Sequence, residues 1–199
     1  MHRYTPMLAT TRPQLVLDDC WAVEPKLDGW RALVYCDEAV TVRTKSGRDA
    51  TASVPELAAL SEHVPSGTVL DGELVTGQGR PSDFYRVAPT LATRRRIWSV
   101  SFVAFDVLVL EGRSVIDEPY LGRRRLLEEL ALGGPSWCTS SSFRGAPREA
   151  ITACLEQGLE GVVLKRLDSR YTPGKRSRHW VKAKSTAWRT VHAPARHDQ

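Results

Sequence analysis

A lysine lies in the stretch EPKLDGWRALVY (24–35), where its neighbours fit either a simple turn or a reactive site. A proline precedes Lys26, and an aspartate, a glycine and an arginine follow it within five residues. Proline and glycine are common in turns between strands, where charged side chains are well solvated. The alternative is that Lys26 is a nucleophile, held in a turn that binds phosphate. This stretch alone favours neither interpretation.

Two acidic residues, Asp71 and Glu73, lie within the apolar segment GTVLDGELVTG (67–77). Residues two apart on a regular strand point to the same face. Two carboxylates among leucine and valine are costly to desolvate unless a cation compensates their charge. A Mg²⁺ ion or a nearby lysine would do so, and the alternative is an exposed strand face.

Two lysines, Lys182 and Lys184, share one face of the segment WVKAKS (180–185). Their charges repel one another unless an anion lies between them, and phosphate is the natural candidate. The alternative is a solvated edge strand, on which lysines oppose aggregation. Glu160 is a further carboxylate at the entrance to an apolar segment, directly after a predicted helix.

The most apolar segment of the chain, SVSFVAFDVLVL (99–110), contains a single acidic residue, Asp106. Its length and composition predict a central strand that is buried on both faces. Because neighbouring side chains on a strand alternate, Phe105 and Asp106 are expected to face opposite sides.

Short apolar segments separated by turn residues predict the elements that position these side chains. The predicted strands are 30–36 and 39–44 (a hairpin), 67–77 (interrupted at Asp71-Gly72), 99–110, 161–168 and 179–185. The predicted helices are 54–64, 121–132 and 146–158. Together they predict an α+β fold with at least six strands, mainly antiparallel, and three or four helices outside.

The composition predicts a soluble globular protein: 199 residues, of which 42% are apolar and 26% charged. No apolar segment is long enough to span a membrane, and the N-terminus lacks an apolar signal core, so we expect a cytoplasmic protein. The four cysteines show no CxxC spacing, which argues against a zinc site and favours reduced thiols.

The net charge of +5 is concentrated in three basic clusters, at 94–96, 123–125 and 175–178. A basic surface suits a polyanionic partner. The cluster at 123–125 opens a predicted helix and is equally explained as its solvated face. The cluster at 175–178 lies in a Pro-Gly loop, where several cations can converge on phosphate.

Taken in order, these motifs resemble the covalent nucleotidyltransferase superfamily, and in particular the adenylation domain of ATP-dependent DNA ligases. The motifs are Lys-x-Asp-Gly-x-Arg at 26, Arg-Thr-x-Ser-Gly at 43, Asp-Gly-Glu at 71, Phe-Asp at 105, Glu-Gly-Val-Val-x-Lys at 160 and Lys-x-Lys at 182. PMLAT, EPKLDGWR and YTPGKRSRHWVKAKS are similar to the bacterial repair ligases of end joining. The resemblance covers roughly residues 5 to 186.

The resemblance implies that Lys26 attacks the α-phosphate of ATP and forms a lysine–AMP phosphoramidate. That reaction needs a neutral amine, and nearby lysines lower a lysine pKa. Lys182 and Lys184 are expected to hold the α-phosphate as pyrophosphate leaves. AMP then passes to a DNA 5′-phosphate, which Arg43 is expected to meet, and the neighbouring 3′-hydroxyl expels AMP.

The other roles concern the nucleotide and the metal. Glu24 is expected to read the adenine edge and Phe105 to stack on the ring, while Arg31 and Glu73 approach the nucleotide and its ribose. The implied metal is Mg²⁺ or Mn²⁺. Its expected ligands are Asp28, Glu73 and Glu160, with Asp28 alternatively orienting the lysine turn.

The resemblance also implies a fold of two antiparallel β-sheets with flanking helices, an ATP-grasp-like nucleotidyltransferase domain. We expect this domain to span 1–186, a tail to span 187–199, and the OB-fold domain of larger ligases to be absent. The expected molecule is a nucleoid-associated monomer, without a membrane partner, that acts on nicked or broken duplex DNA. A separately encoded OB-fold or end-joining protein would complete it.

Two other functions stay open at this point. One is a different member of the superfamily, an RNA ligase or a capping-type guanylyltransferase. The other is a non-catalytic module that binds nucleotides or DNA ends. The presence of Lys26, Glu73, Glu160, Lys182 and Lys184 argues against loss of activity.

Overall fold

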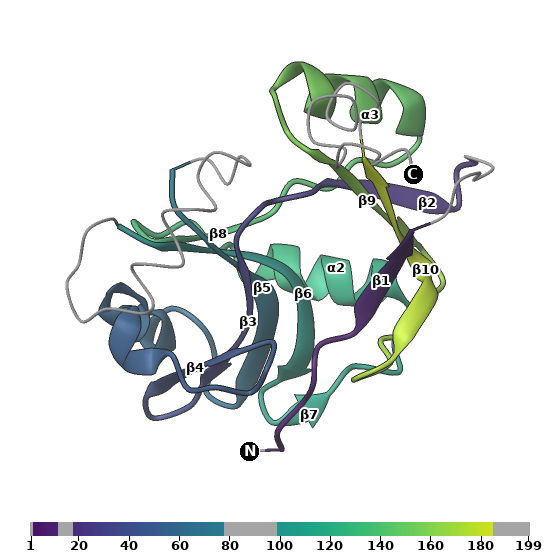
Figure 1. Ribbon diagram of the computed structural model, residues 1–199. Helices are drawn as coiled ribbons and strands as arrows, with labels where there is room; N and C mark the ends of the chain where they lie inside the picture. Colours follow the sequence, from purple (N-terminus) through teal and green to yellow (C-terminus); the bar gives the residue numbers. More distant parts are fainter. Residues whose placement is uncertain (1, 12–17, 78–98, 185–199) are drawn as a thin grey trace, which may run out of the picture.

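Two β-sheets face each other in the computed structural model, which describes residues 2–11, 18–77 and 99–184 (Figure 1). The smaller sheet has the order β1-β10-β9-β2, with bounds Leu8–Thr11, Arg176–Lys184, Gly161–Arg166 and Trp21–Pro25. The larger has the order β4-β3-β5-β6-β7, with bounds Val40–Thr44, Trp30–Cys36, Thr68–Val75, Ser101–Leu110 and Arg113–Ser114. A short strand, β8 (Trp137–Thr139), also pairs with β6. Within the described residues only β1–β10 and β6–β8 pair in parallel, so the α+β prediction is confirmed.

The predicted hairpin is present, because β3 and β4 pair antiparallel from Cys36 and Val40 onward. The predicted interruption at Asp71-Gly72 is wrong, since β5 is one continuous strand. The irregularity lies instead in its pairing with β6, where the register shifts between these two residues. A side chain at Gly72 would meet the ring of Phe102 at 2.4 Å, so glycine permits the close packing here.

Three helical segments cover the outer faces of the sheets. The segment predicted at 54–64 is a 3₁₀-helix, η2 (Pro55–Glu62), preceded by a short turn, η1 (Thr51–Ser53). Its buried Leu57 and Leu60 are three residues apart, the spacing that aligns side chains in a 3₁₀-helix. The other two are α2 (Tyr120–Glu129) and α3 (Pro147–Glu156), close to the predicted bounds. No helix in the described ranges is long and apolar enough to cross a membrane.

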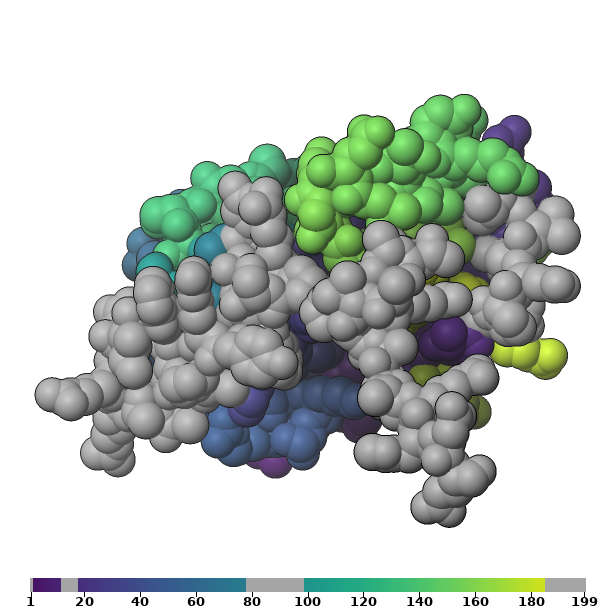
Figure 2. Space-filling model, turned by 45° about the horizontal axis from the view of Figure 1, so that its top comes forward, coloured from purple at the N-terminus to yellow at the C-terminus, as the bar shows by residue number. Residues whose placement is uncertain are grey.

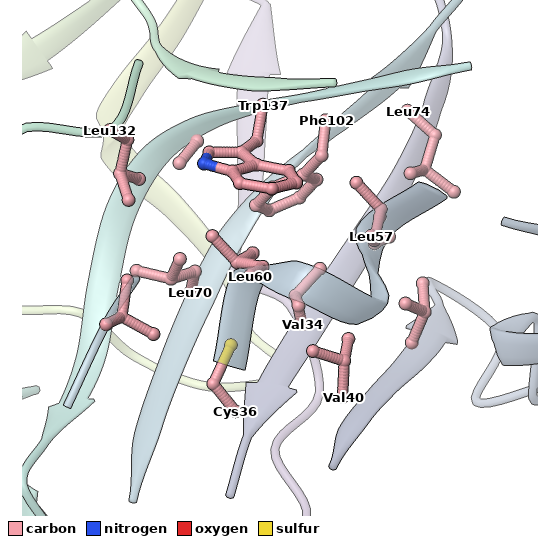
Figure 3. Close-up of a cluster of buried hydrophobic side chains, with 14 of the residues drawn as sticks. Val34, Cys36, Val40, Leu57, Leu60, Leu70, Leu74, Phe102, Leu132 and Trp137 are labelled. Carbon is pink, nitrogen blue, oxygen red and sulfur yellow. The ribbon is translucent and has the colours of Figure 1, made fainter. Parts of the chain in front are cut away.

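Apolar packing fixes both sheets. Leu57 and Leu60 of η2 pack on the outer face of the larger sheet, near Phe102 and Trp137 (Figure 3). On the smaller sheet, α3 covers the face that carries Val162, and its green atoms lie along the top of the molecule in Figure 2. A third cluster lies between the sheets. Because strand side chains alternate, residues next to these apolar positions point into the space between the sheets.

The basic cluster at 123–125 is neither a polyanion surface nor a solvated face. Arg123 and Arg124 are buried, and only Arg125 is exposed. Arg123 donates from Nε and Nη2 to both oxygens of Asp106, at 2.8 and 2.9 Å. The buried acid of β6 and the buried base of α2 therefore compensate one another.

The structure describes one of the other two basic clusters, and it describes all four cysteines. The cluster at 94–96 and the tail at 187–199 lie outside the described residues. In the cluster at 175–178, three side chains are exposed and Ser177 is buried. All four cysteines are free.

Candidate functional site

A cavity of about 740 Å³ lies between the two sheets. Strands β2, β9 and β10 of the smaller sheet and β3, β5 and β6 of the larger one line it. Seven of the residues singled out in the sequence line this cavity: Glu24, Lys26, Asp28, Arg31, Glu73, Phe105 and Lys182. Residues that are up to 158 positions apart in the chain, from Glu24 to Lys182, are thus brought to one site.

Lys26 follows directly after β2, in a turn that is fixed against β9. Its backbone N–H donates to the carbonyl oxygen of Gly161 at 3.0 Å. A side chain at Gly29 would meet the carbonyl oxygen of Leu74 at 2.2 Å, so only glycine lets the turn approach β5 this closely. The Lys26 amine forms an ion pair with Glu160, and it lies 4.0 Å from Asp28. The lysine is therefore held at one defined place in the cavity.

The surroundings of Lys26 favour the neutral amine that a nucleophile requires. Burial lowers the pKa of Lys26, and the charges of Lys182 and Lys184 lower it further, while Asp28 opposes them. The sequence predicted the effect of the two lysines, but burial is the larger cause. Lys184 pairs with the same carboxylate of Glu160, which lies outside the cavity lining.

Arg31 is anchored by a buried carboxylate. Its Nε and Nη2 donate to the two oxygens of Asp71, at 2.5 and 2.6 Å, and the Tyr171 hydroxyl donates to the same group at 2.6 Å. Burial alone would lower the pKa of Arg31, but Asp71 raises it above its ordinary value. The guanidinium lies 4.4 Å from the centre of the Phe105 ring. Arg31 is thus the cation that compensates Asp71.

Glu73 and Lys182 both line the cavity, and burial shifts the pKa of each towards its neutral form. Burial raises the pKa of Glu73 to about 7, although Arg31 and Lys26 oppose the shift. Burial lowers the pKa of Lys182, which Glu73 opposes. A half-buried acid and base facing one cavity can respond to a charged ligand that enters it.

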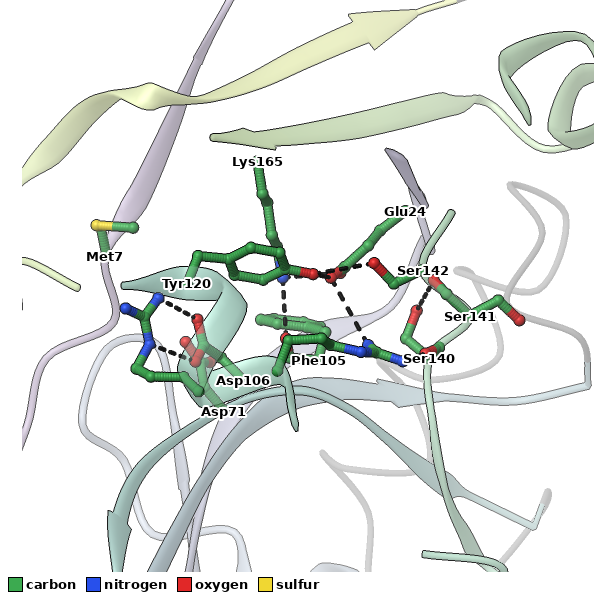
Figure 4. Close-up of polar contacts among 12 residues, drawn as sticks. Met7, Glu24, Asp71, Phe105, Asp106, Tyr120, Ser140, Ser141, Ser142 and Lys165 are labelled. Atoms are coloured by element: carbon green, nitrogen blue, oxygen red, sulfur yellow. Dashed lines mark hydrogen bonds and ion pairs between the residues drawn. The ribbon is translucent and has the colours of Figure 1, made fainter. Parts of the chain in front are cut away.

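Glu24 is deeply buried at the end of β2. It is 2% exposed, and its carboxylate contacts Lys165, Tyr120 and Arg124 (Figure 4). Lys165 is the lysine of the Glu-Gly-Val-Val-x-Lys motif, but the sequence analysis assigned it no role at the site. The alternation of β9 could have found it, since Val163 and Lys165 both line the cavity.

Arg43 does not line the main cavity. It borders a separate groove of about 210 Å³, lies 3.5 Å from Asp49 and donates to the carbonyl oxygen of Gly47. The exposed residues Lys45 and Ser46, just beyond it, do line the cavity. The Arg-Thr-x-Ser-Gly motif contains both Arg43 and Lys45, and it gave no means of choosing which of them contacts the phosphate.

The proposed metal ligands do not form a ready-made site. Among the described residues, no three carboxylate, histidine or cysteine side chains are grouped so as to hold a metal ion. Asp28 and Glu73 line the cavity, and Glu160 reaches it through its pair with Lys26. Oxygen ligands of this kind suit Mg²⁺, which is usually bound by one or two carboxylates together with phosphate and water.

Comparison with known proteins identifies the class. The family model for the ATP-dependent DNA ligase domain matches residues 6–184, so the chain belongs to this family. It is 42% identical over 190 residues to the multifunctional non-homologous end joining DNA repair protein LigD of Mycobacterium tuberculosis. The match covers 93% of this chain and 24% of that protein, so the chain spans about a quarter of this relative.

Solved structures agree with the fold. The ligase domain of M. tuberculosis LigD superposes with a TM-score of 0.79 at 41% identity, covering 91% of this chain and 60% of that one. A mycobacterial DNA ligase D complexed with ATP and MES matches with the same values. A more distant relative, the SPbeta prophage-derived DNA ligase-like protein LigB of Bacillus subtilis, is 30% identical over 180 residues.

Proposed function

We propose that the cavity binds ATP, that Lys26 takes up AMP from it, and that the AMP serves to seal breaks in duplex DNA. The observation that carries this proposal is the Lys26 amine, buried in the cavity with a lowered pKa. Family membership and the ATP complex of a LigD relative support it. A non-catalytic module would have no need of such an amine.

The side chains around the cavity suit the parts of ATP. The Phe105 ring offers a face for the base, and Arg31 and Glu73 lie on the neighbouring strands, where they suit the ribose. The neutral Lys26 amine attacks the α-phosphorus. A P–N bond forms, the bond to the bridging oxygen breaks, and pyrophosphate leaves with the electron pair and takes up the proton that the nitrogen loses. Lys182 is positioned to stabilise the charge that develops on the phosphate.

Mg²⁺ or Mn²⁺ would be held by Asp28, Glu73 and Glu160 together with phosphate oxygens. When bound, it would neutralise phosphate charge. Lys184 pairs with Glu160 beside Lys26, where its amine is positioned to contact the phosphates.

For the later steps, we propose that Lys45 contacts the DNA 5′-phosphate. Lys45 is exposed at the cavity, whereas Arg43 is engaged by Asp49 and Gly47 outside it. The substrate would be nicked or broken duplex DNA, as the end-joining relatives suggest. We further propose that a separately encoded OB-fold or end-joining protein assists, and that the enzyme works at the nucleoid.

The intact mass of the protein after incubation with ATP and Mg²⁺ tests this proposal. Wild type should gain one AMP, and Lys26→Ala should gain none. Lys26→Arg is a second control, because it keeps the charge but cannot act as a neutral amine.

If wild type gains no AMP, the same sample is offered a nick that already carries AMP on its 5′-phosphate. Sealing would preserve the ligase function and limit the failure to the first step. Absence of both activities would overturn the proposal in favour of a binding module.

A further inference from the structure

Arg31 reaches the cavity from β3 with only part of its guanidinium engaged by protein groups. Its Nε and Nη2 donate to the two oxygens of Asp71, and Nη2 also donates to the carbonyl oxygen of Met7 at 3.3 Å. Among the described residues, none accepts a hydrogen bond from Nη1, and the side chain, which lines the cavity, is 18% exposed. Two of the five donors of a guanidinium belong to this nitrogen. Nη1 is therefore the part of Arg31 that can bind a ligand.

Tyr171 joins this ion pair to the N-terminal segment, which comprises residues 4–9. The Tyr171 hydroxyl donates to Asp71 Oδ2 at 2.6 Å and accepts from the backbone N–H of Met7 at 2.8 Å. Tyr171 is 2% exposed and Asp71 is fully buried, so the contacts lie in a medium where hydrogen bonds are strong. The backbone of Met7 thus contacts the ion pair twice, directly through its carbonyl oxygen and indirectly through the hydroxyl.

The N-terminal segment is itself fixed to the loop that precedes β10. Thr172 donates from its backbone nitrogen and from Oγ1 to Met7 Sδ, at 3.2 and 3.1 Å. The backbone N–H of Leu8 donates to the carbonyl oxygen of Lys175 at 2.9 Å. Leu8 and Ala9 then line the cavity. The segment is therefore part of the cavity wall, and its contacts with Tyr171 and Arg31 set its position and theirs together.

We propose that Tyr171 is a positioning residue, which ties the N-terminal segment to Asp71 and so holds Arg31 with Nη1 available to the nucleotide. This inference rests on the proposed ATP site and deepens it. Without the hydroxyl, Asp71 loses one of the three donors that the described residues give it, and the buried N–H of Met7 loses its acceptor. Because Met7 also accepts from Arg31, a shift of the segment displaces the guanidinium.

A double-mutant cycle on ATP affinity tests whether Tyr171 acts through Arg31. The variants are Tyr171→Phe, Arg31→Lys and the two combined. Arg31→Lys keeps the charge but lacks the planar fork that pairs with both oxygens of a carboxylate. Titration calorimetry with ATP in the absence of metal gives the affinities without any chemistry. The matched control is Tyr35→Phe, because the Tyr35 hydroxyl anchors the same segment at a different point, where it accepts from the backbone N–H of Tyr4.

Tyr171→Phe should weaken ATP binding by about tenfold, as expected when a hydrogen bond to a charged group is lost. Arg31→Lys should weaken it at least as much. The loss in the double variant should be well short of the product of the two, because the hydroxyl no longer has a paired guanidinium to position. Tyr35→Phe should weaken binding by about twofold or less, and its effect should multiply with that of Arg31→Lys.

Tripolyphosphate, which has only the phosphate part of ATP, gives a second measurement that does not need the Arg31 variant to fold. In the proposed site Lys26 and Lys182 face the phosphates, and Arg31 faces the ribose. Tyr171→Phe should therefore leave the affinity for tripolyphosphate within about twofold of wild type, whereas a general loosening of the cavity would weaken the binding of both ligands.

Three results would overturn the inference while leaving the ATP site intact. One is an ATP affinity that Tyr171→Phe leaves unchanged. Another is a double variant whose loss equals the product of the single losses, and the third is equal weakening of ATP and tripolyphosphate by Tyr171→Phe, which would mark a structural role only. A wild type that does not bind ATP would instead overturn the proposed function itself.

Discussion

At the scale of single residues, the reactivity of Lys26 depends on its surroundings more than on its own motif. The turn supplies the position, through Gly29 and the hydrogen bond to Gly161. Glu160, 134 residues away, supplies the partner of the amine. The sequence could predict that nearby lysines lower the pKa, because like charges do so at any short distance. It could not predict the burial, which is the larger cause and depends on tertiary packing.

Glu73 gives a prediction about pH and stability. Its pKa is raised to about 7 in the folded protein, from about 4.5 when exposed. A raised carboxyl pKa means that the folded state binds more protons between these values, so ionised Glu73 opposes folding above pH 7. Glu73→Gln removes this cost. We expect it to stabilise the protein by up to about 3 kcal/mol at pH 8 and by little at pH 4.5, from 1.36 kcal/mol per unit.

Urea unfolding of wild type and Glu73→Gln at a series of pH values measures this effect. The exposed Glu62 on η2 provides the control, because Glu62→Gln makes the same change of side chain outside the cavity. A Glu73→Gln effect that does not change with pH would show that the Glu73 carboxyl group titrates as an exposed one.

Most of the site residues that the sequence predicted line the cavity, but the residues that support them were given no role. Glu24, Arg31, Glu73 and Phe105 stood out because they interrupt apolar segments or follow a family motif. Supporting residues such as Lys165 lie inside regular elements, and whether a buried cation has a partner is decided by another part of the chain.

At the scale of elements, α2 is held to the larger sheet by a buried ion pair and by apolar contacts. A pattern of apolar and polar residues treats Arg123 as a surface residue, so the sequence did not predict its burial. Leu127 of this helix is fully buried, and Leu126 and Leu130 are partly buried against the same core. Strands were predicted more reliably. A short apolar segment bounded by turn residues indicates a strand, whichever other strand it pairs with.

Replacing Arg123 by methionine should destabilise the protein by about 3–5 kcal/mol, since Asp106 would be left buried without its partner. Arg125→Met, on the exposed side of the same helix, should change the free energy of unfolding by about 0.5 kcal/mol or less. Chemical denaturation of the two variants measures both. If Arg123→Met also carries Asp106→Leu, much of the loss should be recovered; a double variant no more stable than the single one would contradict the ion-pair explanation.

At the scale of the whole molecule, the net charge of +5 suits the proposed DNA substrate. Each phosphate contact releases counterions, so the logarithm of the association constant falls with the logarithm of the salt concentration by about 0.9 per contact. Lys45→Ala should reduce this slope by about one contact. Arg43→Ala should leave it unchanged, because Arg43 is engaged with Asp49.

Fluorescence anisotropy of a nicked duplex over a range of salt concentrations compares the two variants. In the reverse result, only Arg43→Ala reduces the slope. That result would assign the contact with the 5′-phosphate to Arg43. Equal slopes in all three proteins would exclude both residues from phosphate contact.

The strand order of the smaller sheet also has a consequence for synthesis on the ribosome. Its two edge strands, β1 and β2, come from the start of the chain, and the strands between them, β9 and β10, come from residues 161–184. Ala9 and Arg176, which contact each other across this sheet, are 167 residues apart. Chains emerge N-terminus first. Strands β1 and β2 therefore cannot pair with β10 and β9 until nearly all of the described domain has left the ribosome. Until then a nascent chain lacks half of the cavity wall, and its early strands are exposed edges for chaperones to protect.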